Sequence, residues 1–138
     1  MPGNGRTVGM LNSPKERAKR CILIEMMLGI QEAIAKLEFD GEVSLVLMAV
    51  RLGHYQGKPL DITSLAGATS LPRTTVLRHI RLLEANDRIA IKRGSRRTVV
   101  TLNGKAETKF TKPFYQRVER IVREASRDLS ILDTKTID

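Results

Sequence analysis

Arginine and threonine side chains with clear chemical potential gather in one short segment of this chain. Arg73, Thr74, Arg78 and Arg81 fall on one side of the segment if it is helical. An arginine guanidinium can donate two parallel hydrogen bonds to guanine or hold a phosphate, and a threonine hydroxyl can bond either partner. This side therefore carries the donors with which a helix binds in the major groove of duplex DNA.

The other side of the same segment is apolar. Val76, Ile80 and Leu83 follow one another at spacings of four and three, which predicts a core-facing stripe. Leu77 falls on the outward side, where it can contact a thymine methyl or pack on an adjoining hairpin. His79 lies between the two faces, and its role stays open. The candidate recognition residues are Arg73, Thr74, Thr75, Leu77, Arg78 and Arg81; Thr75 and Arg81 fit phosphate better than a base.

A basic hairpin is expected next. Residues 89–92 and 98–102 are rich in Ile, Val and Thr, as strands are, and Gly94 supplies the turn between them. Between Arg73 and Arg97 there are eight basic residues and two acidic ones. An arginine-bearing hairpin beside a recognition helix can reach the flanking backbone or a narrow minor groove. The candidate hairpin residues are Lys92, Arg93, Ser95, Arg96 and Arg97.

The segment before Arg73 is predicted to position this helix. Asp61 can cap a short helix that contains Leu65 and Ala66, and residues 70–72 form a turn before the second helix. Ser70 stands where this turn usually has glycine. The second helix is expected to end at Asn86-Asp87, because both residue types tolerate left-handed backbone. A helix-turn-helix followed by a hairpin wing is therefore expected over 61–102.

Long helices are expected at both ends. One begins at Ser13, which can cap it, and runs to about Phe39; another covers 42–55; the last covers about 112–129 and can extend to 132. The first is apolar on more than one face and needs cover from a second subunit or from its own core. We expect dimerisation through Leu23, Met26, Met27, Ile30, Ile34, Phe114, Val118, Ile121, Val122 and Ala125.

Composition narrows the class of protein. The 138 residues carry a formal charge of +9 with a pI near 10.2, which favours a polyanionic partner, nucleic acid before an anionic membrane. No apolar run approaches the roughly 20 residues of a membrane span, and residues 1–13 lack a secretory signal and are expected to form a flexible start. A single cysteine, Cys21, fits a reducing, cytoplasmic compartment. Neither a metal-ligand pattern nor a cofactor motif nor a catalytic constellation is recognisable, so no enzyme is expected.

The order of elements resembles the MarR family of bacterial transcription regulators. The residues that carry the resemblance are Leu65-Ala66, Leu71, Arg73-Thr74-Thr75-Val76, Arg78 and Leu83-Glu84, and the stretch from Leu71 to Val76 is also similar to IclR-type DNA-binding domains. The resemblance implies a mainly α fold with a small β-hairpin wing. It also implies a homodimer with interlocking terminal helices that binds a pseudo-palindromic operator and represses transcription. Residues 14–138 would form one winged helix-turn-helix domain, with dimerisation helices at 14–39 and 112–132 around a DNA-binding core at 42–102.

Three hypotheses follow. The first is a sequence-specific, homodimeric regulator of transcription that binds double-stranded DNA. The second is a low-specificity nucleoid-associated, replication or partition protein that uses the same module. The third is a winged helix that contacts another protein. No feature identifies a small-molecule effector, and Cys21 is either a plain buried cysteine or a thiol sensor.

Overall fold

The computed structural model describes residues 13–135, which belong to two compact units. One unit contains the chain up to Ala33 and from Phe114 onward, and the other spans Ile34–Pro113. The predicted flexible start, except Ser13, lies outside the described residues. The elements are α2 (Pro14–Ala35), α3 (Gly41–Tyr55), β1 (Leu60–Asp61), α4 (Ile62–Thr69), α5 (Arg73–Ala85), β2 (Ile89–Arg93), β3 (Thr98–Leu102) and α6 (Thr111–Thr134).

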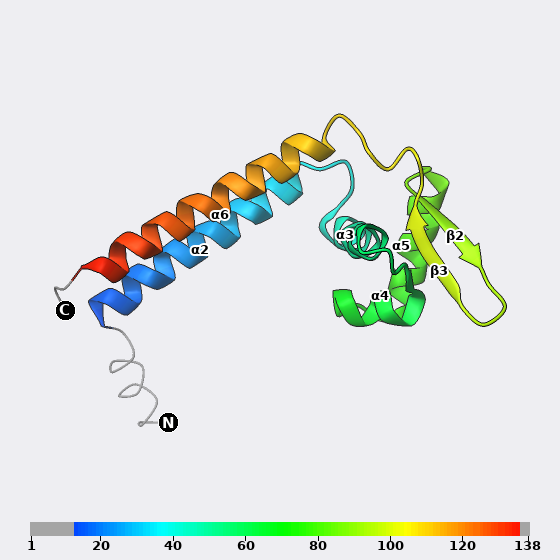
Figure 1. Ribbon diagram of the computed structural model, residues 1–138, viewed down its shortest axis with the longest axis horizontal. Coiled ribbons are helices and arrows are strands. Elements are labelled where there is room, and N and C mark those ends of the chain that lie inside the picture. Colours follow the sequence, from blue (N-terminus) through cyan, green and yellow to red (C-terminus); the bar gives the residue numbers. More distant parts are fainter. Residues whose placement is uncertain (1–12, 136–138) are drawn as a thin grey trace, which may run out of the picture. The chain divides into compact units, whose positions relative to one another are not determined.

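In the first unit, α2 and α6 lie side by side and antiparallel (Figure 1). Ion pairs join them at both ends, Lys19 with Asp133 at 3.3 Å and Arg117 with Glu32 at 3.4 Å. Between these pairs the helices approach closely, since a Cβ built on Gly29 would lie 3.5 Å from Ile121 Cδ1. The expectation that the last helix packs on the first is confirmed.

Two predicted helix ends are wrong. The first helix stops at Ala35 instead of Phe39, and the Phe39 ring packs on the core of the other unit. Apolar periodicity continued past the end of the helix because Phe39 is partly buried against the core of the unit Ile34–Pro113, to which it belongs. The last helix continues to Thr134, beyond the predicted 129 or 132, and the Thr134 hydroxyl donates to the Ile131 carbonyl at 2.8 Å.

The second unit is built around one apolar core. Val76, Ile80 and Leu83 of α5 are each at most 1% exposed, so the predicted core stripe is confirmed. Burial of each such side chain stabilises the fold by roughly 1.5–3 kcal/mol before the entropy cost of ordering. The other members of this core are Val43, Val46, Ala49, Val50, Ile62, Leu65, Ile89 and Val100.

A three-stranded antiparallel sheet covers one edge of this core, in the order β1-β3-β2. The predicted hairpin pairs Ile89 with Leu102 and Arg93 with Thr98. The outer strand β1 was not predicted, because two residues are too few to show an alternating pattern. Its pairing of Asp61 with Val99 fixes the start of α4 against the wing.

Side-chain caps stabilise three helix starts: the caps at Asp61 and Ser13 were predicted from the sequence, and the cap at Asp40 was not. Asp61 Oδ1 accepts the Ser64 N–H at 2.8 Å, Asp40 Oδ1 accepts the Val43 N–H at 2.9 Å, and Ser13 Oγ accepts the Glu16 N–H at 3.1 Å. Ser70 has a φ of 58°, the left-handed conformation that turns α4 into α5 and for which glycine is usual. Asp87, with a φ of 59°, follows the end of α5.

Candidate nucleic-acid interface

The outward face of α5 carries side chains that are not used by the fold. Thr74, Arg78 and Arg81 are exposed. The side chains of Arg78 and Arg81 have no hydrogen bond or ion pair with any residue of the described chain. Their donors are therefore available to an external acceptor, as the sequence predicted for a groove-binding face.

Arg73, at the start of α5, is held more firmly. Its Nη1 donates to the Thr63 hydroxyl of α4 at 2.6 Å. This bond links the two helices across the turn and fixes the guanidinium near the start of α4. Arg73 is exposed, but its direction is set before any ligand arrives.

The placement of Leu77 on the outward face is corrected by the structure. Leu77 is half-buried and packs against the core cluster of the unit, while Thr75 is also half-buried. A leucine side chain is long enough to bend toward the core from the border of a helix face. The exposed face of α5 is therefore more polar than the spacing suggested.

The open question of His79 is answered by its burial. The ring is 7% exposed, and its Nε2 lies 2.9 Å from Glu42 Oε1 at the start of α3. Glu42 itself is largely exposed at the surface. His79 therefore joins α5 to α3 and cannot contact DNA without leaving its place.

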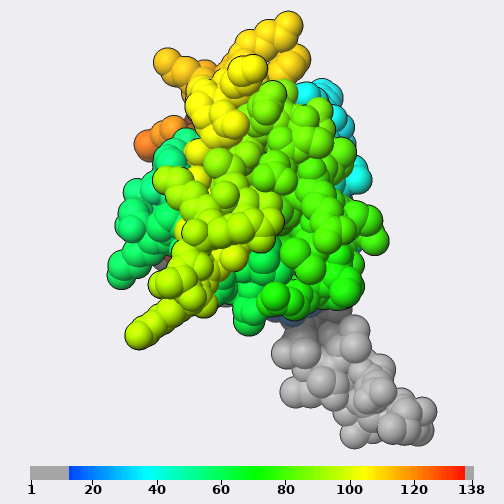
Figure 2. All heavy atoms as spheres, turned by 90° about the vertical axis from the view of Figure 1, so that its right-hand side faces the viewer, coloured from blue at the N-terminus to red at the C-terminus, as the bar shows by residue number. Residues whose placement is uncertain are grey.

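The wing extends from the same unit as a basic hairpin. Its loop closes with the Gly94 N–H donating to the Arg97 carbonyl at 2.8 Å, and a Cβ at Gly94 would lie only 2.9 Å from that oxygen. Figure 2 shows the tip, in yellow-green, projecting beyond the green helices beside it. The exposed wing side chains without a partner within residues 13–135 are Lys92, Arg93, Ser95 and Arg96.

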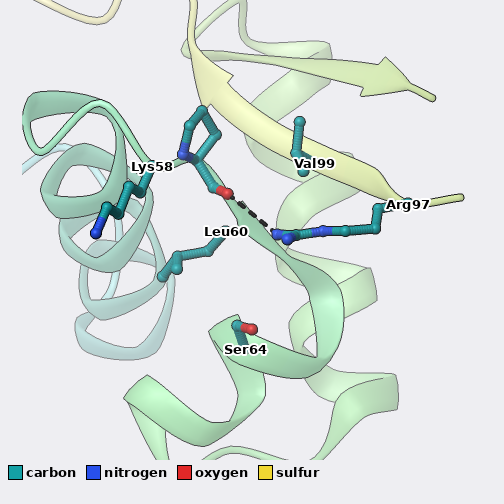
Figure 3. Close-up of a pocket in the computed structure, with 6 residues that line it drawn as sticks. Lys58, Leu60, Ser64, Arg97 and Val99 are labelled. Atoms are coloured by element: carbon teal, nitrogen blue, oxygen red, sulfur yellow. Dashed lines mark hydrogen bonds between the residues drawn. The ribbon is translucent and has the colours of Figure 1, made fainter.

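Arg97 folds back toward the helix-turn-helix. Its Nε lies 3.5 Å from Asp61 Oδ2, and its Nη2 donates to the Pro59 carbonyl at 3.4 Å. Figure 3 shows the Arg97 side chain above Ser64 of α4, with a dashed line that marks its hydrogen bond to the Pro59 carbonyl. Arg97 thus braces the wing base against β1 and α4, a role that the loop position of Arg97 did not indicate.

The ionisation of Asp61 depends on this arrangement. Hydrogen bonds from the backbone and side chain of Ser64, followed by the positive charges of Arg97 and Arg73, lower the pKa of the Asp61 carboxyl, although partial desolvation opposes them. The carboxylate is therefore kept ionised while it caps α4 and pairs with the wing. Sequence reasoning identified the cap but not the pairing with Arg97.

Two further arginines have structural partners that the sequence did not reveal. Arg88 binds Glu38 and the Lys105 carbonyl, so it leaves the basic set counted between Arg73 and Arg97. Arg51 of α3 is 6% exposed and donates to the Tyr55 hydroxyl at 2.9 Å and to the Ala106 carbonyl at 3.3 Å. The only feature of the sequence that could have indicated this structural role was the position of an arginine among the apolar residues of α3.

The predicted dimerisation residues divide into two groups. Those whose burial places them within the chain's own packing are Met26, Ile30, Ile34, Phe114, Val118, Ile121 and Ala125. Leu23, Met27 and Val122 remain 39%, 56% and 44% exposed. Ile24 and Leu28 widen the apolar surface on α2, and Cys21, which the sequence favoured as a buried cysteine, is also exposed there.

Neither metal-binding nor membrane-spanning features were found in the described part of the chain. Residues 13–135 contain no cluster of three or more histidine, cysteine, aspartate or glutamate side chains that could hold a metal ion. None of the described helices is long and apolar enough to cross a membrane.

Comparisons with known proteins support the fold. Neither a protein-family model nor a curated protein sequence matches the chain. Among solved structures, MepR, a transcription regulator of the Staphylococcus aureus multidrug efflux pump MepA, is 20% identical, with a TM-score of 0.62 over 80% of each chain. The transcriptional regulator Tm0710 from Thermotoga maritima is 19% identical, with a TM-score of 0.61 over 88% of this chain and 89% of that one.

A third similar structure belongs to the MarR family, after which this type of winged helix fold is named. A MarR family protein from Bacillus stearothermophilus is 18% identical, with a TM-score of 0.53 over 97% of this chain and 84% of that one. The helix-turn-helix and its hairpin make this chain a winged helix protein. More narrowly, it has the winged helix-turn-helix fold of the MarR type, as its sequence predicted.

Proposed function

We propose that this protein is a sequence-specific, DNA-binding regulator of transcription. The observation that carries the proposal is the unpaired polar face of α5, with Thr74, Arg78 and Arg81 exposed above a fully buried apolar face. A helix anchored in this way can enter the major groove without disturbing the core. The exposed arginines of the wing that have no partner within residues 13–135, Arg93 and Arg96, add contacts to the flanking backbone or minor groove.

The similar structures agree with this role. A variant of the S. aureus protein MepR has been solved bound to an oligodeoxyribonucleotide, and it superposes on this chain with a TM-score of 0.56 at 20% identity. The net charge of +9 favours association with DNA at any sequence. Selectivity then depends on base contacts, for which Arg78 is the best-placed donor.

The regulator acts as a homodimer in this proposal. Leu23, Ile24, Met27 and Leu28 expose between 39% and 64% of their surface on α2, an apolar cluster that a second copy would cover. A symmetric dimer presents two recognition helices to two half-sites about 34–36 Å apart, so its operator is pseudo-palindromic. Occupying such an operator at a promoter would repress transcription.

The test is selection of bound duplexes from fragments of the source genome, followed by binding measurements at one fixed salt concentration. A discrete, pseudo-palindromic motif bound at least about a thousandfold more tightly than shuffled DNA is expected. Uniform enrichment would instead identify a low-specificity nucleoid-associated, replication or partition protein. An absence of binding to any duplex would contradict DNA binding and leave a protein-contacting winged helix.

Arg78→Ala gives the test its internal control. Loss of a base contact should cost about 1–3 kcal/mol on the selected duplex and much less on shuffled DNA. Arg120→Ala removes an exposed arginine of α6, outside the winged helix unit, and should leave the ratio of the two affinities unchanged. An equal loss on both duplexes for Arg78→Ala would contradict base reading by this residue.

A further inference from the structure

A hollow of about 230 Å³ lies where the helix-turn-helix meets the base of the wing. Its walls include Thr63 at the start of α4, Arg73 at the start of α5, and Arg96 and Arg97 of the wing loop. Asp61 contributes the one acidic side chain. The hollow thus draws on β1, α4, α5 and the wing loop of the same compact unit.

The charge of these walls favours an anion. Three guanidinium groups face one carboxylate, which leaves a formal surplus of two positive charges. The carboxylate of Asp61 is already engaged by the Ser64 N–H at 2.8 Å and by Arg97 at 3.5 Å. Its negative charge is therefore partly balanced before a ligand approaches.

The hydrogen-bond donors of the hollow are not exhausted. An arginine has five N–H donors, and Arg73 uses one of them on Thr63 at 2.6 Å. Arg97 uses donors on Asp61 and Pro59, whereas Arg96 has no side-chain partner in the part of the chain that the structure describes. Because Arg73 and Arg97 are held in place, an anion that binds between them would meet donors that are already positioned.

The volume suits a small anionic group. A water molecule takes about 30 Å³ in the liquid, so the hollow has room for a phosphate together with several ordered waters. Arginine is the usual partner of such groups because its planar fork matches two phosphate oxygens. The hollow is also open to solvent at exposed Arg73 and Arg96, so a group attached to a long polymer can reach it.

We propose that this hollow binds one phosphate of the DNA backbone, an inference that rests on the proposed DNA-binding function. It lies between the exposed face of α5, which would occupy a major groove, and the wing, which would reach the adjacent minor groove. One sugar-phosphate strand of the DNA separates a major groove from the adjacent minor groove. The phosphates of that strand must therefore pass between α5 and the wing. Arg73 is therefore a phosphate contact that sets the register of the complex, and base reading is left to Arg78.

The experiment combines arginine variants with a methylphosphonate scan of the selected duplex, in which one backbone charge is removed at a time. Arg73→Ala should weaken binding to selected and shuffled duplexes by the same factor, about tenfold, and should reduce the slope of log K against log salt by about 0.9. One methylphosphonate position should weaken the wild-type complex and have no further effect on Arg73→Ala. Arg78→Ala should respond at that position as the wild type does.

Controls guard against unfolding and against a different anion. Arg96→Ala alters an exposed loop, so it repeats the test if Arg73→Ala fails to fold. We expect the same methylphosphonate position to be silent in this variant, that is, to cause no further loss of binding. Inorganic phosphate, added at constant ionic strength, should compete with the duplex only weakly. Competition at low millimolar phosphate would reassign the hollow to free phosphate and overturn the proposal.

The possible failures are distinguishable. A wild-type protein that binds no duplex at all contradicts the proposed function itself. A wild type that binds a discrete operator, combined with an Arg73→Ala variant that changes the preference for that operator, contradicts only the phosphate site. The phosphate site alone is also contradicted if no single methylphosphonate position becomes silent in both Arg73→Ala and Arg96→Ala.

Discussion

Arg88 Nη2 donates to both carboxylate oxygens of Glu38, at 2.9 and 2.8 Å. The same guanidinium donates through Nη1 to the Lys105 carbonyl at 3.2 Å. Glu38 lies in the connection between α2 and α3, and Lys105 lies in the connection between β3 and α6. One side chain of the winged helix unit thus holds both segments through which the chain passes to the other unit.

Arg88→Ala should loosen both connections. Loss of hydrogen bonds to a charged, largely buried guanidinium should lower the free energy of unfolding by about 1–2 kcal/mol. Amide hydrogen exchange should accelerate in segments 36–40 and 104–107 more than in the core strands. Unchanged exchange in both segments would show that the contact does not restrain them.

Arg123→Ala is the matched control for that variant. Arg123 Nη2 lies 2.7 Å from Glu119 Oε2, a distance as short as the Arg88–Glu38 contacts, but both side chains are more than half exposed. An exposed pair of this kind on a helix contributes about 0.3–0.5 kcal/mol. Equal losses of stability from the two arginine variants would contradict the argument that burial makes the difference.

His79→Ala should destabilise the fold without changing sequence preference. Removing a buried ring leaves a cavity and deprives Glu42 of its partner, at a cost of about 2–3 kcal/mol. Because the ring is buried beside Glu42 of α3 and is not among the proposed DNA contacts, the ratio of affinities for selected and shuffled duplexes should stay constant. Glu42→Gln keeps an acceptor for the ring and should cost much less; thermal melts and binding titrations measure both effects.

Asp61 predicts a pH dependence of stability. The pKa of its carboxyl is lowered from the ordinary 3.8 in the folded chain, so the folded state favours the ionised form. The resulting stabilisation is complete about a unit above pH 3.8 and is lost as the pH falls through the folded pKa. Because the side chain is partly exposed, solvent screening keeps the effect small.

The comparison of Asp61→Asn with the wild type isolates this effect. Asparagine caps a helix about as well as aspartate, so the substitution chiefly removes the charge that pairs with Arg97. Urea unfolding should show the wild type to be more stable at about pH 6, with the two curves converging below about pH 4. Asp128→Asn on α6 controls for the loss of one carboxylate, and a constant difference from about pH 6 to about pH 2.5 would contradict the prediction.

Ser70 should tolerate glycine and reject branched residues. Its φ of 58° costs a non-glycine residue roughly 1–2 kcal/mol relative to right-handed backbone. Ser70→Gly should therefore leave stability unchanged or raise it by up to about 1 kcal/mol, while Ser70→Val should lower it by more than about 1 kcal/mol. Thermal unfolding measures both variants, and a stabilising valine would contradict the assignment of this turn.

The parts of the fold that sequence predicted well depend on local signals. The cap at Asp61, the turn at residues 70–72 and the core stripe of α5 are each set by residues within a few positions of one another. The exposed donors Arg78 and Arg96 were predictable for the same reason, because helix and hairpin geometry alone place them outside.

The missed features depend on contacts between distant residues. Arg88 and Glu38 are separated by 50 positions, and Arg51 and Ala106 by 55, so no spacing rule connects them. The pairing of β1 with β3, which brings Asp61 next to Arg97, was not predicted. Arg97 was therefore assigned to the wing tip. Three of the basic residues counted toward DNA binding, Arg73, Arg88 and Arg97, are therefore engaged, fully or in part, by the fold.

The exposed apolar cluster of α2 predicts how the proposed dimer should respond to charge. Leu23→Glu combined with Met27→Glu places two carboxylates on a surface that is already 39% and 56% exposed in one chain. The double variant should keep its helical content and fold, because neither position is buried within the subunit. It should sediment as a monomer and bind a pseudo-palindromic duplex at least about tenfold more weakly, because one half-site contact is lost.

Ile30→Glu separates dimerisation from folding. Ile30 is half-buried against the chain's own packing, so a carboxylate there should lower the free energy of unfolding as well as any association. Sedimentation velocity and thermal unfolding should therefore distinguish the two variants. The Leu23→Glu, Met27→Glu double variant should lose only the dimer, whereas Ile30→Glu should also unfold at a lower temperature. A wild-type chain that is monomeric at tens of micromolar would contradict the homodimer, since exposed leucine and methionine would then have no second copy to cover them.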